Sequence, residues 1–113
     1  MGNNVWVKSG TTRNMFAEPG ATTTSTSLVC YKDSPYTTFQ ATVLGTGTVT
    51  ATIVIDVSND GVYWVSTPMG TITLSSTDSA SDGFTSSAPW KYVRARITAI
   101  SGTGATVQVC MGV

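Results

Sequence analysis

The chain has 113 residues, of which 41% are hydrophobic and 11% are charged, and its six Lys and Arg balance its six Asp and Glu. This length fits one domain with a single core, and zero net charge removes the electrostatic footprint of a nucleic-acid-binding protein. No apolar run approaches the roughly 20 residues of a membrane helix, and the N-terminus lacks the pattern of a secretory signal. We therefore expect one domain over residues 1–113, with no direct nucleic-acid or membrane partner, made in the cytoplasm of the cell that produces it.

Ser and Thr replace charged residues as the source of polarity, at roughly 30% of the chain, far above average usage. Thr has a high strand propensity, and the many Val, Ile and aromatic residues supply a core that a disordered chain lacks. The composition therefore predicts an all-β protein.

Residues 1–20 are predicted to form an N-terminal arm that contacts a partner. A short strand over residues 4–8 leads into an irregular segment, RNMFAEPG, that ends in a Pro-Gly turn. Trp6, Met15 and Phe16 are apolar residues in polar surroundings, and aromatic residues and Met are enriched at protein interfaces. The alternative is a flap folded over the protein's own core.

The middle of the chain alternates short apolar runs with turn residues. Strands are predicted over residues 22–31, 36–44 and 49–57, with Gly45-Thr46-Gly47 as a hairpin link. In the last of these runs, alternate residues share one face, which predicts a half-buried strand. The stretch SNDGVYW at 58–64 then predicts a hairpin turn and a return strand over 62–66, with Tyr63 and Trp64 serving packing.

The C-terminal half continues this pattern. Strands are predicted over 71–74, 90–100 and 105–111, separated by a polar loop at 75–83 and a turn at 101–104. About eight strands without helical periodicity indicate a single-domain β-sandwich of the jelly-roll type. Residues 90–100 form the longest run, which is expected to place Val93, Ala95, Ile97 and Ala99 inward and Tyr92, Arg94, Arg96 and Thr98 outward.

The residues that enzymes use are scarce. The chain has no His, which excludes the familiar nucleophilic triads and imidazole zinc sites, and its carboxylates fall mostly in predicted turns. We expect neither enzymatic activity nor a metal or cofactor. Cys30 and Cys110 lie in apolar runs and are expected to be buried thiols, with a disulfide as the alternative.

Two sets of side chains remain as candidate contact sites. Tyr92, Arg94 and Arg96, with Lys91 nearby, form either a strip for an acidic or carbonyl-rich partner or a solvated outer face. Trp6, Trp64 and Trp90 form either a platform for a sugar ring or buried packing residues.

From Val57 onward the chain carries a series of short motifs: Ser-Asn-Asp-Gly before Trp64, ITL at 72–74, SDGF at 81–84, APW at 88–90, YVRAR at 92–96 and the GTGA-x-V pattern at 102–107. With these motifs this half of the chain resembles small structural proteins of tailed bacteriophages.

The resemblance implies a virion component, with a capsid decoration or cement protein as the first choice. Such proteins sit on the capsid surface, commonly as homotrimers, and bind the major capsid protein. The alternative is a tail- or fibre-associated module that binds a receptor or a glycan.

Overall fold

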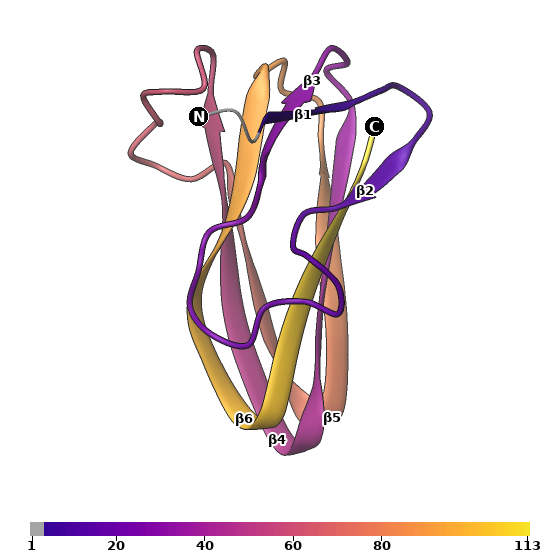
Figure 1. Ribbon diagram of the computed structural model, residues 1–113, viewed down its shortest axis with the longest axis vertical. Helices are drawn as coiled ribbons and strands as arrows, with labels where there is room; N and C mark the ends of the chain where they lie inside the picture. The colour runs from indigo at the N-terminus through magenta and orange to yellow at the C-terminus, as the bar shows by residue number, and fades with distance from the viewer. Residues whose placement is uncertain (1–3) are drawn as a thin grey trace.

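The computed structural model describes residues 4–113, which form a body with principal extents of 39 × 25 × 25 Å. The described residues form six strands and no helix, so the all-β prediction is confirmed and the expected count of about eight strands is wrong. Three long strands run the length of the molecule, and three short ones lie near the end that holds both termini (Figure 1). In chain order the strands are β1 (Asn4–Val7), β2 (Thr12–Asn14), β3 (Val29–Lys32), β4 (Thr37–Ser58), β5 (Gly70–Ser86) and β6 (Tyr92–Gly112).

All six strands belong to one sheet, in the order β1-β3-β6-β4-β5, with β2 pairing separately to β6. Strand β4 lies between β5 and β6 and is antiparallel to both, whereas β1 and β3 are parallel. The strands β1 and β5 therefore end this path.

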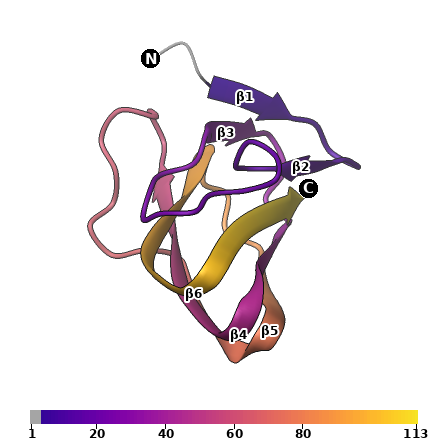
Figure 2. The same ribbon diagram turned by 60° about the horizontal axis from the view of Figure 1, so that its bottom comes forward.

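The sheet folds over on itself because each long strand bends near its middle, at the end shown lowest in Figure 1 and brought forward in Figure 2. Positive φ angles mark the bend: Gly47 (73°) in β4, Asp78 (67°) in β5, and Gly102 (124°) and Gly104 (65°) in β6. The pairing register also shifts there, and a bulge of this kind bends a strand and increases its twist. The Asp78 carboxylate accepts a 2.8 Å hydrogen bond from the Gly47 N–H, which ties two bends together.

Three turn or loop predictions are therefore wrong. Residues 45–47 and 101–104 are bends within continuous strands, and residues 75–83 belong to β5. Gly accepts a positive φ in a hairpin and in a bent strand alike, so the local pattern does not distinguish the two. The chain bends instead of reversing because both halves of each long strand pair with the same neighbouring long strand.

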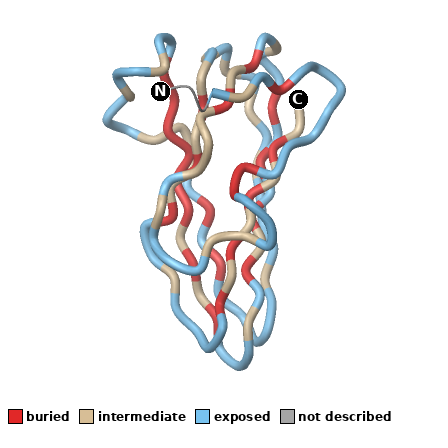
Figure 3. The backbone as a smooth tube through the Cα atoms, in the orientation of Figure 1, coloured by how far each residue is buried: buried red, intermediate tan, exposed pale blue. Residues whose placement is uncertain are grey.

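The core lies between the two halves of the folded sheet, where Figure 3 shows buried segments along the inner course of the long strands. One cluster contains Phe39, Ala41 and Val43 from the first half of β4 together with residues of its second half. The inward phase predicted for 49–57 is confirmed, because its five inward residues are at most 2% exposed: Val49, Ala51, Ile53, Ile55 and Val57. The predicted half-burial holds only for the first part of the run, because Val54 and Asp56 on the other side are 8% and 2% exposed. In β6 the alternation predicted for Ala99 fails, because the register shifts between the pairs Thr52–Ala99 and Ile53–Ile97, and Ala99 is exposed.

Residues 8–28 run along the edge of β6 that β4 leaves free. The Met15 N–H donates to the Val109 carbonyl at 2.8 Å, and an isolated bridge joins Ala21 to Val107. The strand predicted over 22–31 is thus wrong in extent, since only Val29–Lys32 is regular. Met15 and Phe16 are 0% and 8% exposed, which matches the flap over the protein's own core rather than an exposed partner contact. Residues 1–3 of the predicted arm lie outside the described residues.

Among residues 4–113 there is no helix with the length and apolar character needed to cross a membrane.

Candidate partner-binding face

The second half of β4 and the first half of β6 present a polar outer face. Their register sets Asp56 opposite Arg94 and Ser58 opposite Tyr92. The neighbouring residues Val93 and Ala95 are 0% exposed, whereas Tyr92, Arg94 and Arg96 are all partly exposed. The predicted outward direction of Tyr92, Arg94 and Arg96 is therefore confirmed.

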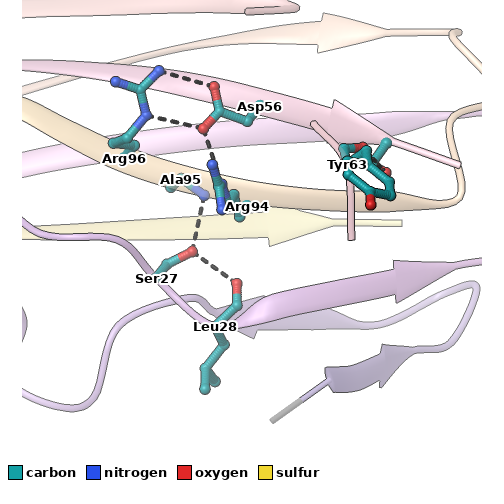
Figure 4. Close-up of polar contacts among 8 residues, drawn as sticks. Ser27, Leu28, Asp56, Tyr63, Arg94, Ala95 and Arg96 are labelled. Atoms are coloured by element: carbon teal, nitrogen blue, oxygen red, sulfur yellow. Dashed lines mark hydrogen bonds and ion pairs between the residues drawn. The ribbon is translucent and has the colours of Figure 1, made fainter. Parts of the chain in front are cut away.

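Asp56 binds both arginines (Figure 4). Its Oδ2 accepts hydrogen bonds from Nε of Arg94 and Nε of Arg96, each at 3.0 Å, and its Oδ1 accepts one from Nη2 of Arg96 at 3.1 Å. The Asp56 side chain is only 3% exposed, against 26% for Arg94 and 39% for Arg96. The face is thus an ordered ion-pair cluster, not a set of freely solvated side chains.

The electrostatics of this cluster leave an excess of positive charge. Burial by itself raises the pKa of Asp56, but the hydrogen bonds and charges of Arg96 and Arg94 outweigh it, and the pKa lies below its ordinary value. The same hydrogen bond raises the pKa of Arg96. Two guanidinium groups share one carboxylate, and within the described chain the Nη atoms of Arg94 and Nη1 of Arg96 have no hydrogen-bond partner. These donors can bind carbonyl or carboxylate oxygens of a partner.

Ser27 fixes the neighbouring edge of this face, also visible in Figure 4. Its hydroxyl donates to the Leu28 carbonyl at 2.8 Å and accepts from the Ala95 N–H at 2.8 Å. The irregular segment before β3 is thereby held against β6, beside the two arginines.

The loop after β4 covers one end of the face. Residues 62–66 form no strand, so the predicted hairpin return is wrong. Instead Asp60 Oδ1 accepts hydrogen bonds of 2.9 Å from the N–H groups of Val62 and Tyr63, and these bonds lower the pKa of Asp60. An Asp that binds the backbone ahead of it is a turn former, which explains why SNDG closes a loop here rather than a two-residue hairpin.

Trp64 and Tyr63 take different roles. The Trp64 ring lies against Arg94, with the guanidinium carbon 4.2 Å from its centroid, which is within cation–π range. This agrees with the predicted packing role. Tyr63 is 80% exposed, so its predicted packing role is wrong.

An aromatic row crosses three strands beside the arginines. The register aligns Trp6, Tyr31 and Tyr92, and the rings of Tyr31 and Tyr92 lie 5.2 Å apart. With Asn4 and Val5 they line a shallow recess of about 410 Å³, and Trp6 is 57% exposed. Trp6 thus joins this row, whereas Trp64 stacks on Arg94 and Trp90 packs against the core beside Asn59 and Pro89. The three Trp residues have different neighbours and do not build one shared recess.

The sequence reading missed Asp56 and Lys32. The alternation of residues 49–57 places Asp56 on the outward side of the strand, and this was the sequence feature that could have indicated it. Its ion pairs with the arginines depend on the position of β6, which the sequence does not show. Lys32 is 1% exposed, and its Nζ donates to the carbonyls of Ser34 and Ala88 at 3.0 and 3.1 Å. Burial, with a contribution from the charge of Lys91, lowers the pKa of Lys32.

Cys30 and Cys110 are both free, so the disulfide alternative is wrong, and the predicted burial is confirmed for Cys30 but not for Cys110, which is partly exposed. Cys30 is fully buried, and burial raises the pKa of its thiol to about 11 against a smaller opposing effect of Arg13. Within residues 4–113, no group of three or more His, Cys, Asp or Glu is arranged to hold a metal ion.

No protein-family model, curated protein or solved structure matches the chain. The phage resemblance described above therefore stays a prediction.

The pH dependence of stability should follow the two carboxylates. Asp56 and Asp60 have folded pKa values below the ordinary 3.8, so their stabilisation is complete above the unfolded pKa and is lost as the pH falls through the folded values. We expect urea unfolding midpoints to be similar at pH 7 and pH 5 and to drop steeply below about pH 4. A midpoint that stays constant down to pH 2.5 contradicts this assignment.

Proposed function

We propose that this protein is a bacteriophage virion structural protein, a capsid decoration protein that binds the major capsid protein and stabilises the shell. In this proposal it lies on the capsid surface as a homotrimer and works through its surfaces, without catalysis, a cofactor or direct contact with nucleic acid. The two halves of the single folded sheet are proposed to serve as the layers of the β-sandwich expected from the sequence, with the jelly-roll path as a further part of this proposal.

One observation carries the proposal: the segments that resemble phage proteins supply the two arginines and Tyr92 of the polar and aromatic face, together with the loop that covers it. SNDGVYW forms the loop that covers Arg94, and the YVRAR segment supplies Tyr92, Arg94 and Arg96. The face joins free guanidinium donors to exposed aromatic and aliphatic side chains, with Val62 68% and Tyr63 80% exposed. Aromatic residues and Arg are the residue types enriched at protein interfaces.

The alternative is a tail- or fibre-associated module that binds a glycan, and the recess beside Trp6 favours it. An exposed indole with the Tyr31 and Tyr92 rings alongside offers an apolar surface with polar ends, which can stack against a sugar ring. Under this alternative, Trp6 binds the ligand and the arginines only shape the sheet.

The binding test uses capsids that lack the protein. We expect Tyr63→Ala to weaken co-sedimentation with these capsids at least about tenfold, because an exposed aromatic anchor at an interface contributes more than about 1.4 kcal/mol. Thermal unfolding should be unchanged, since Tyr63 is 80% exposed. The matched control is Leu44→Ala, which removes a side chain that is 55% exposed but lies at the sheet bend, away from this face.

Two further measurements separate the candidate functions. A decoration protein should be present in many copies per virion, and a trimer of the 11.8 kDa chain should have a mass of 3 × 11.8 = 35.4 kDa by light scattering. Few copies per particle, no capsid binding and specific glycan binding that Trp6→Ala abolishes would instead establish the alternative.

A further inference from the structure

The outer edge of β5 is open. β5 ends the strand path, and β4 is its only partner among the described strands. At 17 residues it is a long edge, and an unpaired edge presents a row of free backbone donors and acceptors that can pair with another chain.

The two halves of this edge differ in protection. Residues 78–86 contain the positive-φ Asp78 at the bend, and Asp82 uses its carboxylate to bind the Gly83 N–H at 2.8 Å. Charges, bulges and occupied backbone groups are the devices that keep an edge from pairing.

Residues 70–77, GTITLSST, have none of these devices. The segment carries no charge and no Pro, and its register with β4 is unbroken from Gly70–Ile55 to Thr77–Thr48. Pro68 lies just before it and Asp78 just after it, so the open stretch has a defined beginning and end.

We propose that residues 70–77 form a docking edge for the same residues of a second copy, paired antiparallel about a two-fold axis at Thr73. The inference rests on the sheet topology and is independent of the capsid proposal. In a virion this contact would join neighbouring trimers.

The segment is complementary to itself in this register. Ile72 and Leu74 are 3% and 2% exposed on the core side of the strand, so in this register Ile72 would lie opposite Leu74 of the partner subunit with both side chains already buried. The backbone hydrogen bonds of the added strand would therefore carry the contact on this side. On the outer side, exposed Thr71 would meet Ser75 of the partner subunit, and hydroxyl pairs of this kind stabilise antiparallel strands.

Charge also favours a second copy of this chain. The zero net charge gives two copies no long-range repulsion, and the open segment offers no charge that would select a charged partner. In the proposed register Asp78 lies opposite position 68, which is Pro68, so the acidic residues that follow the segment do not meet each other.

The test introduces a charged side chain at Thr73, on the proposed two-fold axis. We expect sedimentation of the wild-type chain to show a concentration-dependent species of 2 × 11.8 = 23.6 kDa, or a doubling of the trimer mass if trimers form. Thr73→Lys should remove this step without changing the melting temperature, because Thr73 is exposed and identical charges would face each other on the axis. Thr85→Lys, the same change at an exposed position in the protected half of β5, should leave the step intact.

A mixing experiment with two oppositely charged variants tests the proposed axis directly. Thr73→Lys and Thr73→Glu proteins should each fail to double alone, and an equimolar mixture should recover the doubled species through opposite charges at the axis. A wild type that shows no doubling, or a doubling that both variants retain, overturns the inference. If the variants no longer double but still form trimers, the docking edge at residues 70–77 is supported. If the wild type forms no trimer or does not bind capsids, that result contradicts the proposed function and leaves the inference about the edge untouched.

Discussion

Replacing Asp56 with Asn is expected to lower the free energy of unfolding by about 2–3 kcal/mol. The Asp56 side chain is 3% exposed and neutralises two guanidinium groups, so the uncharged amide leaves Arg94 and Arg96 close together without a counterion. Removing one partner of a fully buried ion pair costs about 3–5 kcal/mol, and we expect less here because both arginines are partly open to solvent. Urea unfolding followed by circular dichroism measures the change.

Two comparisons sharpen this result. Asp33→Asn removes an exposed carboxylate and should change stability by less than about 0.5 kcal/mol. The Asp56→Asn protein should also lose part of the acid sensitivity expected of the wild type. A loss of stability below about 1 kcal/mol would show that the cluster is no stronger than an ordinary surface ion pair.

Gly102→Ala is expected to destabilise the protein by about 3 kcal/mol, because it strains the bend of β6 in two ways. The residue has φ of 124°, and a Cβ there would lie 2.8 Å from Cγ1 of Val49 and 2.9 Å from the carbonyl oxygen of Thr48. The bend in β4 lies directly against this site, so the two strands must separate to admit a methyl group.

Gly104→Ala is the matched control. Gly104 also has a positive φ, at 65°, but no atom lies within 4 Å of the position that its Cβ would take. The free energy of unfolding of Gly104→Ala should therefore fall only by the backbone penalty of about 1–2 kcal/mol. Equal losses in the two variants, measured by urea unfolding, would show that the strands do not approach at the bend as described.

Gly102 lies at the bend of the sheet and Asp56 lies near the end of β4, so changes at the two sites have different consequences. The bend decides whether the two halves of the sheet enclose one core, so Gly102→Ala should affect folding as a whole. The ion-pair cluster sits on the outer face, where it holds Arg94 beneath Trp64 and next to the aromatic row. Under the proposed function, a variant that weakens the cluster should therefore impair capsid binding even under conditions where the protein remains folded.

Local pattern was sufficient for some features of the fold. High Thr content and apolar alternation indicated an all-β protein, and the phase of residues 49–57 identified the inward face of β4, because side chains of a strand alternate whatever its partners are. The same alternation gave the outward direction of Tyr92, Arg94 and Arg96. The absence of His and the balance of charges are properties of the sequence itself.

Other features depended on contacts between distant residues. Gly45-Thr46-Gly47 and Ser101-Gly102-Thr103-Gly104 offer positive φ angles, but only long-range pairing decides whether the chain reverses or bends at such residues. Met15 and Phe16 look like exposed anchors until their segment is placed along β6, and the Asp56 cluster exists only because β4 and β6 meet in one register. Sequence alone determined the inward side of residues 49–57 and of Val93, Ala95 and Ile97, since that follows from the period of the backbone where the register is unbroken. Tertiary structure decided which strands continue and which charges meet, since those depend on contacts such as Gly47–Asp78, 31 positions apart, and Asp56–Arg96, 40 positions apart.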